Sequence, residues 1–251
     1  MQRKKLVNQL TELLKPFQIS DFCPNGLQVE GKDNIKKVIT GVTASQALID
    51  VAIEKNADAL LVHHGYFWKG EEQSITGMKK RRIQSLLTHD INLLAYHLPL
   101  DVHPELGNNA QLGKLLDLEI ERPLEPWNKN SVAVKGKLKN PMTVAEFAKL
   151  IEDKLDRKPL VNQAGDHLIK TIAWCTGGGQ SFIDLAASQG IDAYLTGEAS
   201  EQTIHSSNEQ GIHFFAAGHH ATERYGVKAL GEYLADKYDL DVEFVDINNP
   251  V

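Results

Sequence analysis

Histidine and carboxylate side chains follow three apolar segments of this 251-residue chain, and these are the residues best suited to chemistry. The six side chains concerned are His63, His64, His97, Asp101, His219 and Glu223. Imidazole nitrogens and carboxylate oxygens, with no thiolate among them, are typical ligands of Zn, Mn, Fe, Ni or Co in catalytic sites. The residue types therefore predict a metal centre.

The apolar segments that precede these residues read as buried β-strands. Residues 59–62 are continuously apolar, as in a strand covered on both faces, and 92–96 and 213–217 have a similar character. In open α/β sheets, ligands bind outside the carboxyl ends of the strands, where loops from several strands converge. We therefore expect the three strand ends to contribute to one site.

The adjacent histidines indicate two metal ions rather than one. Successive strand residues point to opposite sides, so His63 and His64 are expected to serve different metals. Two divalent ions about 3.5–4 Å apart and bridged by a carboxylate would activate a bridging water. His219 and Glu223 are four residues apart, and a helix expected at 222–238 places Glu223 in its first turn.

Each of these residues also has a structural interpretation. A single histidine at a strand end is more often a satisfied structural residue, and only the coincidence of three strand ends favours a metal site.

The Thr176–Gly179 segment is expected either to bind a phosphate or to allow close packing of a strand and a helix. Glu198 is a candidate outer ligand, substrate contact or helix cap, and the aromatic run 66–68 is expected to line a pocket for a planar base or to pack between subunits.

Two histidines close to the candidate ligands are expected to be bystanders. His103 follows the turn that contains Asp101, and His220 directly neighbours His219. No Gly-x-Ser-x-Gly motif or paired cysteine and histidine points to covalent catalysis.

Hydrophobic periodicity predicts an α/β protein with mainly parallel sheets and the metal site at the carboxyl ends of the strands. Helices are expected at 4–14, 45–55, 76–88, 108–116, 144–155, 182–188, 200–208 and 222–238, and strands at 37–42, 59–62, 91–96, 131–137, 168–175, 192–195, 213–216 and 241–247. The proline-rich segment 122–130 interrupts this alternation. We therefore predict an N-terminal lobe at 1–125, which carries His63, His64 and Asp101, and a C-terminal lobe at 126–251, which carries His219 and Glu223.

The composition of the chain indicates which kinds of partner it can bind and which compartment it fits. The formal net charge of −6 and the pI of about 5.9 argue against a protein that binds the nucleic-acid backbone, and the basic run 79–82 is expected to be a solvated helix face. Two distant cysteines, Cys23 and Cys175, fit a reducing compartment and exclude a cysteine-based zinc site. The N-terminus lacks an apolar signal segment, and no stretch approaches the ~20 apolar residues of a membrane span. The expectation is a cytoplasmic protein that does not enter membranes.

Several motifs together resemble a known family. They are Asn25–Gly31, His63–Gly65, His97 with Asp101, Thr176–Gly179, Thr196–Glu198 and Gly218–Glu223. Their order is similar to that of the dinuclear-metal proteins related to the NGG-one-interacting factor three, whose bacterial members are called GTP cyclohydrolase 1 type 2 homologs. The resemblance spans essentially the whole chain.

This resemblance implies a division of roles among the ligands. His64 and Asp101 would bind one metal, His63 and His219 the other, and Glu223 would bridge them.

The resemblance leaves His97 beside the ligands, as a proton-transfer or substrate-facing residue. It further implies two intertwined α/β lobes that act as one functional unit, a short form without the domain that some members insert, and a toroidal homohexamer with metal sites facing an interior cavity.

The sequence supports two alternative functions, and it gives less support to a third. The first is a dinuclear-metal-dependent hydrolase, in the cyclohydrolase version attacking C8 of a guanine nucleotide with metal-bound hydroxide and releasing formate. The second is a non-catalytic metal-binding scaffold, metal-delivery factor or regulatory protein. The third, a ring that threads DNA, conflicts with the acidic composition.

Overall fold

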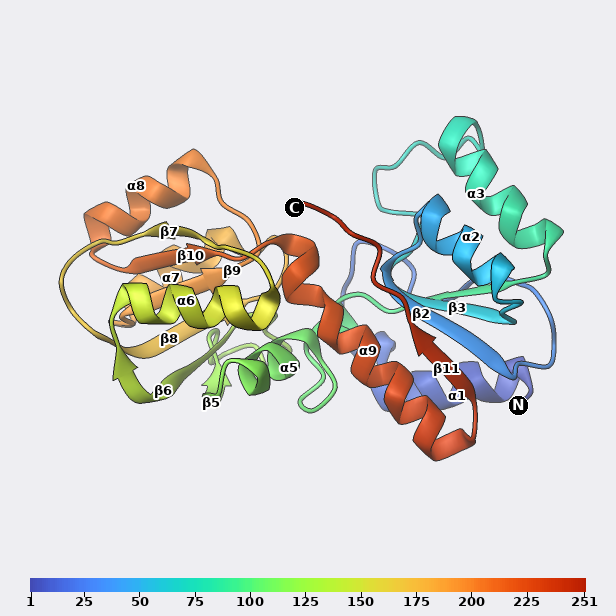
Figure 1. Ribbon diagram of the computed structural model, residues 1–251, viewed down its shortest axis with the longest axis horizontal. Helices are drawn as coiled ribbons and strands as arrows, with labels where there is room; N and C mark the ends of the chain where they lie inside the picture. Colours follow the sequence, from blue (N-terminus) through green and yellow to red (C-terminus); the bar gives the residue numbers. More distant parts are fainter. The chain divides into compact units, whose positions relative to one another are not determined.

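A computed structural model describes all 251 residues, which form two compact units with one β-sheet each (Figure 1). Unit 1 comprises Met1–Leu106 and Gly226–Asn248, and unit 2 comprises Gly107–Tyr225 and Asn249–Val251. The first division of the chain therefore lies earlier than the lobe boundary expected near residue 125. The reason is that β5 (Leu118–Pro123) pairs with β6 (Val134–Met142), the next strand of unit 2.

Unit 1 is built around a five-stranded sheet in the order β1-β4-β3-β2-β11. Its elements are α1 (Arg3–Leu14), the short 3₁₀ helix η1 (Pro16–Gln18), β1 (Gly26–Val29), β2 (Lys37–Thr43), α2 (Gln46–Glu54), β3 (Ala59–His64), α3 (Gly77–Thr88), β4 (Asn92–Ala95), α4 (Leu98–Asp101), β11 (Asp241–Phe244) and the second part of α9 (His219–Tyr238). Strands β11, β2, β3 and β4 are parallel neighbours, and only the edge strand β1 is antiparallel. The parallel sheet predicted from the sequence is confirmed in this unit.

Both faces of the unit 1 sheet are covered, which explains its continuous apolar strands. Ile39 and Leu60 point into one core with residues of α2 and α3, whereas Val38 and Leu61 point into the other core with residues of α1 and α9. Figure 1 shows α2 and α3 on one side of this sheet and α1 and α9 on the other.

Unit 2 contains a six-stranded sheet in the order β5-β6-β8-β9-β10-β7. Its elements are α5 (Asn108–Leu115), β5, β6, α6 (Val144–Leu155), β7 (Leu160–Asn162), β8 (Ile169–Cys175), the short 3₁₀ helix η2 (Gln180–Phe182), α7 (Ile183–Ser188), β9 (Ala193–Thr196), α8 (Glu201–Gln210), β10 (His213–Ala216) and the first turns of α9. Helices α5 and α6 pack on one face of this sheet, and α7 and α8 pack on the other.

The prediction of mainly parallel pairing is wrong for the unit 2 sheet. Only β8–β9 and β9–β10 are parallel, and the other three pairs are antiparallel. Parallel neighbours need a crossover connection, usually a helix. Helix α7 connects β8 to β9 and helix α8 connects β9 to β10, whereas the loop at 124–133 returns the chain directly from β5 to β6.

Most predicted elements are present, but several short ones were missed. Helix α6 has the predicted bounds because Thr143 and Glu146 form a capping box at its start. The strand expected at 131–137 runs instead from Val134 to Met142. The short elements β5, β7 and α4 were also not predicted.

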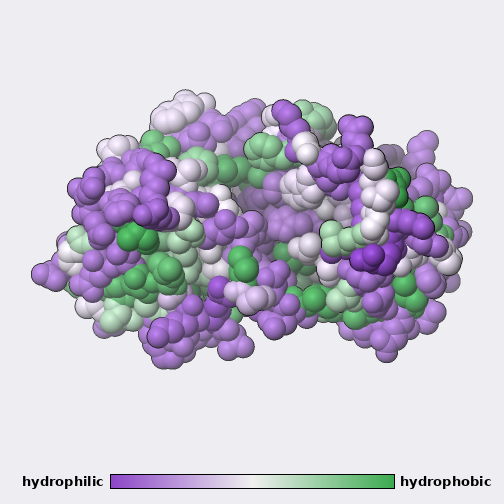
Figure 2. All heavy atoms as spheres, turned by 90° about the horizontal axis from the view of Figure 1, so that it is seen from above, coloured by the Kyte–Doolittle hydropathy of each residue, from purple (hydrophilic) through white to green (hydrophobic).

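Hydrophilic residues cover most of the surface seen in Figure 2, with smaller hydrophobic areas between them. The exposed large hydrophobic side chains include Phe17, Phe22 and Trp127. No helix has the length and apolar character that crossing a membrane would require.

Candidate functional site

In unit 1, His63 and His64 are the last two residues of β3 rather than the first residues after it. Pairing between β3 and β4 ends at Val62 and Ala95, whereas pairing with β2 continues to His64, which lies opposite Thr43. Their ring centroids lie 4.6 Å apart. The two rings therefore lie in one cluster rather than on opposite sides of the strand, and their assignment to different metals stays a prediction.

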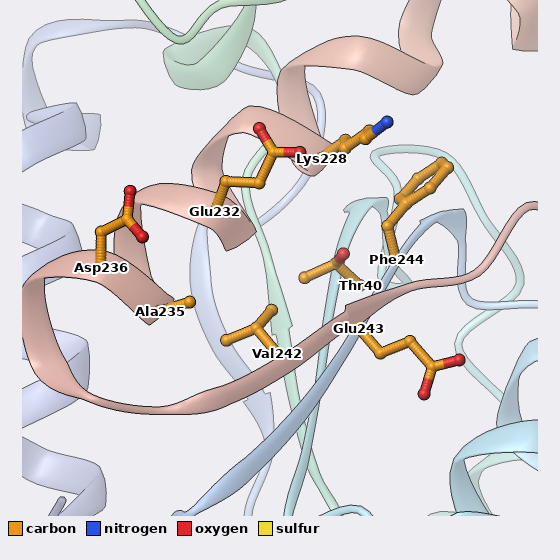
Figure 3. A pocket seen from close by; sticks show the side chains of 8 residues that line it. All are labelled: Thr40, Lys228, Glu232, Ala235, Asp236, Val242, Glu243 and Phe244. Atoms are coloured by element: carbon orange, nitrogen blue, oxygen red, sulfur yellow. The ribbon is translucent and has the colours of Figure 1, made fainter.

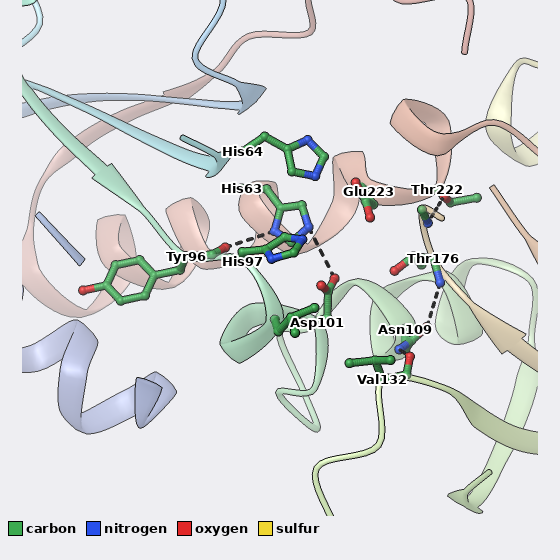
Figure 4. Close-up of polar contacts among 12 residues, drawn as sticks. His63, His64, Tyr96, His97, Asp101, Asn109, Val132, Thr176, Thr222 and Glu223 are labelled. Atoms are coloured by element: carbon green, nitrogen blue, oxygen red, sulfur yellow. Dashed lines mark hydrogen bonds and ion pairs between the residues drawn. The ribbon is translucent and has the colours of Figure 1, made fainter. Parts of the chain in front are cut away.

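His63 is buried and has a defined tautomer. Its Nδ1 lies 3.0 Å from the carbonyl oxygen of Tyr96, and because a carbonyl only accepts hydrogen bonds, Nδ1 carries the proton. Its Nε2 lies 3.5 Å from Oδ1 of Asp101, which ends the short helix α4 (Figure 4). His64 is held by its strand neighbour, since its Nδ1 lies 3.2 Å from Oγ1 of Thr43.

His97 directly follows Tyr96, beyond the end of β4, and it belongs to the same cluster. One ring nitrogen each of His63, His64 and His97 lie within 4.8 Å of one another. Nδ1 of His97 lies 2.7 Å from Oδ1 of Asp21, and the ring of Trp68 packs edge-on against it with a centroid separation of 4.9 Å.

Asp21 was not singled out from the sequence. The available signal was a carboxylate in the polar loop that leads to the Asn25–Gly26 pair.

In unit 2, His219 and Glu223 lie on one face of the same helix. Helix α9 begins at His219, three residues earlier than the predicted start at Thr222, so the two side chains are one helical turn apart. Nε2 of His219 lies 3.2 Å from Oε2 of Glu223, and Nδ1 lies 2.6 Å from Oε1 of Glu198, which follows β9. Burial would lower the pKa of His219, but Glu223 and Glu198 together raise it to about 9.

The glycine-rich segment Thr176–Gly179 gives space to these ligands. A Cβ atom on Gly177, which has a φ of +65°, would lie 2.1 Å from Oε1 of Glu223 and 2.9 Å from Nε2 of His219. The N–H of Gly177 donates to Oγ1 of Thr222, and that of Gly179 donates to Oγ1 of Thr196. These N–H groups are thus already engaged, which favours the close-packing interpretation over phosphate binding.

Hydrogen bonds fix both ends of this segment, and Figure 4 shows two of them. The N–H of Thr176 donates to Oδ1 of Asn109, 3.1 Å away, and the bond from Gly177 to Thr222 is 3.0 Å long. Gly177 therefore has a fixed position beside Glu223.

The aromatic residues after His64 have separate roles. Tyr66 is buried and its hydroxyl donates to the carbonyl of Ala44, so it is part of the core of unit 1. Phe67 is exposed, and Trp68 is half-buried against His64 and His97. Of these three aromatic residues, only Trp68 therefore contacts the histidine cluster.

A cavity of about 570 Å³ lies elsewhere in unit 1, between α9 and strands β2 and β11 (Figure 3). Its lining residues are Thr40, Lys228, Glu232, Ala235, Asp236, Val242, Glu243 and Phe244. None of them is a histidine or a cysteine, so this cavity lacks the ligands that transition metals prefer.

Comparison with known proteins places the chain in a family. The model of the Duf34/NIF3 (NGG1p interacting factor 3) family matches residues 1–250. The chain belongs to this family. A Haemophilus influenzae member named GTP cyclohydrolase 1 type 2 homolog is 64% identical over 251 residues, which cover 100% of this chain and 98% of the relative. An Escherichia coli member with the same name is 56% identical, with 100% of both chains covered.

Solved structures of Duf34/NIF3 relatives have the same fold. The structure titled protein ybgI, unknown function, superposes with a TM-score of 0.97 at 55% identity, with 100% of both chains covered. TTHA1606 from Thermus thermophilus gives a TM-score of 0.89 at 36% identity, again over 100% of both chains. Reduced HcgD from Methanocaldococcus jannaschii gives 0.86 at 26% identity over 98% of each chain.

Proposed function

We propose that this chain is a dinuclear-metal-dependent hydrolase that acts on a guanine nucleotide. The orientation of the histidines carries the proposal. His63, His64, His97 and His219 each have Nδ1 next to an oxygen of their own unit, and Nε2 of His63 and of His219 lies beside Asp101 and Glu223 respectively. In metal-binding histidines, the ring nitrogen that does not bind the metal is usually hydrogen-bonded to a carbonyl or carboxylate oxygen.

The proposed ligand set is that of the family pattern. His64 and Asp101 would bind one metal, His63 and His219 the other, and Glu223 would bridge them. Two observations support the fit of divalent Zn, Fe, Mn, Ni or Co: the donors are imidazoles and carboxylates, and Gly177 provides the space beside Glu223 that any side chain would fill.

The names of the relatives support the proposed substrate. Members at 64% and 56% identity are called GTP cyclohydrolase 1 type 2 homologs. In the proposed reaction, water attacks C8 of the guanine ring, the imidazole ring opens, and a second water releases C8 as formate. When bound, the metals would supply an activated water, whose pKa falls to about 7, and a Lewis acid. His97 would accept and return protons beside the ligands.

Assembly and location are also part of the proposal. The chain passes between the two units after Leu106, Tyr225 and Asn248, which supports two interlocked lobes that work as one functional unit. Relatives of the same length support a short form without an inserted domain. We further propose a toroidal homohexamer in the cytoplasm; the chain has only two cysteines, far apart in sequence, which fits a reducing compartment.

The test of the hydrolase is formate release from GTP by metal-loaded protein. We expect turnover by the wild type and loss of at least about 100-fold in a His63→Ala variant, since loss of a ligand perturbs the metal and its activated water. Equal rates in the two proteins, including no formate from either, would overturn the cyclohydrolase reaction.

A non-catalytic metal-binding scaffold is the second candidate, because the family is named for an interaction. The two functions differ in one observation. Turnover of any small molecule that disappears in Glu223→Ala supports the hydrolase, whereas metal binding without turnover of a broad set of hydrolase substrates supports the scaffold.

A further inference from the structure

Asp21 lies outside every predicted ligand set, yet its carboxylate is bonded to the histidine cluster of unit 1. Its side chain is 4% exposed and contacts His97, whose side chain is 14% exposed. The 2.7 Å contact between Oδ1 of Asp21 and Nδ1 of His97 is short for a nitrogen–oxygen hydrogen bond, as expected for an ionised acceptor.

The carboxylate of Asp21 already has a full set of donors. Oδ1 accepts from the N–H of Phe22 at 2.6 Å in addition to His97. Oδ2 accepts from Nδ2 of Asn25 at 2.8 Å and from the N–H of Leu98 at 3.0 Å. Burial would raise the pKa of Asp21, but the hydrogen bonds from His97 and Asn25 outweigh it and leave the pKa below its ordinary value. Asp21 is therefore an ionised orienting group and not a spare metal ligand.

Cys23 lies within 4.8 Å of the donor atoms of Asp21 and His97, which raises the alternative of a separate metal site here. Burial and the nearby Asp21 charge raise the pKa of the Cys23 thiol to about 12. The Asp21 carboxylate is already engaged by four donors, one of them Nδ1 of His97, so we assign Asp21 and His97 to positioning rather than to a separate metal site.

The backbone of His97 is fixed by the same loop. Its N–H donates to Oδ1 of Asn25 at 2.7 Å, and the amide of that same Asn25 donates to Asp21. On the other side, the ring of Trp68 packs edge-on against His97, and Trp68 is itself held by a hydrogen bond from Nε1 to the carbonyl of Gly65. The imidazole is thus restrained by its backbone, its Nδ1 and one flank.

We propose that Asp21 is a positioning residue that holds His97 as the Nδ1–H tautomer, with the lone pair of Nε2 directed at the His63 and His64 cluster. A carboxylate without a proton can only accept at Nδ1, so the proton of the neutral ring must stay there. His97 then begins the reaction as a proton acceptor. This inference rests on the proposed hydrolase for its catalytic consequence, but the tautomer itself does not depend on turnover.

The step that this tautomer permits is balanced. As the oxygen of the attacking water bonds to the carbon of the substrate, its proton moves to Nε2 of His97 and leaves a cationic imidazolium beside the Asp21 carboxylate. When the carbon–nitrogen bond breaks, Nε2 returns that proton to the departing nitrogen. Asp21 keeps its charge throughout and stabilises the imidazolium.

The test is the tautomer of His97 in metal-free protein, read from ¹⁵N chemical shifts and long-range ¹H–¹⁵N correlations. Spectra are recorded over a series of rising pH, and the tautomer is read where the ring shifts no longer change with pH. His97→Gln assigns the signals. We expect a single Nδ1–H form in the wild type. In Asp21→Asn we expect a substantial Nε2–H population, because the amide NH₂ group of asparagine can donate to Nδ1 of His97, which then carries no proton. Asp33→Asn, the same change at a surface carboxylate, serves as the control.

The rate of turnover is the second measurement. In a protein that releases formate, Asp21→Asn should lower kcat by about 10²- to 10⁴-fold with little change in KM, and Asp21→Glu should restore part of the loss. An unchanged Nδ1–H tautomer in Asp21→Asn would overturn the proposal. A wild type with the expected tautomer but no turnover would overturn the hydrolase and leave the positioning role of Asp21 intact.

Discussion

Gly177 decides how closely the backbone of unit 2 approaches Glu223. It has a positive φ, and the carboxylate of Glu223 occupies the place where a Cβ atom would stand. The sequence presents three consecutive glycines, but only the structure distinguishes them: Gly178 is exposed, and a Cβ atom there would come no closer than 3.7 Å to any neighbour.

This difference predicts the effect of two matched substitutions. Gly177→Ala should displace the Glu223 carboxylate or the His219 ring, and so weaken metal binding by about 10- to 100-fold, the usual range for a displaced ligand support. Gly178→Ala should bind metal like the wild type. The measurement is the Kd for Zn²⁺ by competition with a chelating dye. Equal affinities in the two variants would show that Glu223 and His219 do not hold the metal.

His219 makes metal binding dependent on pH. Its pKa in the metal-free protein is raised to about 9, so at pH 7.5 the ring is protonated and a metal must displace that proton. We expect proton release on binding at pH 7.5, and an apparent affinity that rises with pH until about 9.

Calorimetry in buffers with different ionisation enthalpies measures the number of protons released. Glu198→Gln removes one of the two carboxylates that raise the pKa of His219, so it should release fewer protons than the wild type. Release that is unchanged in this variant would contradict the assigned cause.

At the scale of elements, both units use the same connection at the start of a β-α-β segment. Oδ2 of Asp58, just before β3, accepts from the N–H groups of Lys36 and Lys37 at the start of β2. Oδ2 of Asp192, just before β9, accepts from the N–H groups of Lys170 and Thr171 at the start of β8. In each case one carboxylate ties together the beginnings of two parallel strands.

Loss of this carboxylate should weaken unit 2 in a pH-dependent way. Burial would raise the pKa of Asp192, but hydrogen bonds from Thr171 and Lys170 outweigh it and lower the pKa below 3.8. Its contribution to stability is therefore complete above pH 3.8 and is lost as the pH falls through the lowered pKa. Asp192→Asn should reduce the free energy of unfolding by about 1–2 kcal/mol at pH 7, because the site is partly exposed.

Urea unfolding at pH 7 and at pH 3 measures this effect. The difference between wild type and Asp192→Asn should shrink at the lower pH, and the exposed control Asp166→Asn should differ from wild type by less than about 0.5 kcal/mol at pH 7. A difference that stays constant with pH would contradict the role of the ionised carboxylate.

The long amphipathic and fully apolar elements could be predicted from the sequence, whereas local packing could not. Helix α6 was placed correctly because its cap and its periodicity agree, and the start of strand β3 because a continuous apolar run begins at Ala59, although the strand continues to His64. The antiparallel pairs of unit 2 were missed because strand direction depends on which edge each connection reaches, which periodicity does not record. Asp21 was missed for a similar reason, since 76 residues separate it from His97.

At the scale of the whole molecule, the resemblance to the family predicts six copies. Large hydrophobic side chains such as Phe17, Phe22 and Trp127 are exposed on the single chain, as is common where a surface is covered on assembly. Size-exclusion chromatography with light scattering should give about six times the chain mass of 27.9 kDa. A mass of one chain at micromolar concentration would contradict the hexamer.

Two metal ions are proposed to be held by His63, His64, Asp101, His219 and Glu223. The most direct test of this proposal is the metal content per chain of the protein as isolated, measured by mass spectrometry of the elements. We predict two equivalents of divalent metal in the wild type and in the surface control His89→Ala, and fewer than one in Glu223→Ala, which would lose the bridge. Equal metal content in Glu223→Ala and the wild type, or a wild type that binds no metal when supplied with it, would contradict the proposed two-metal site.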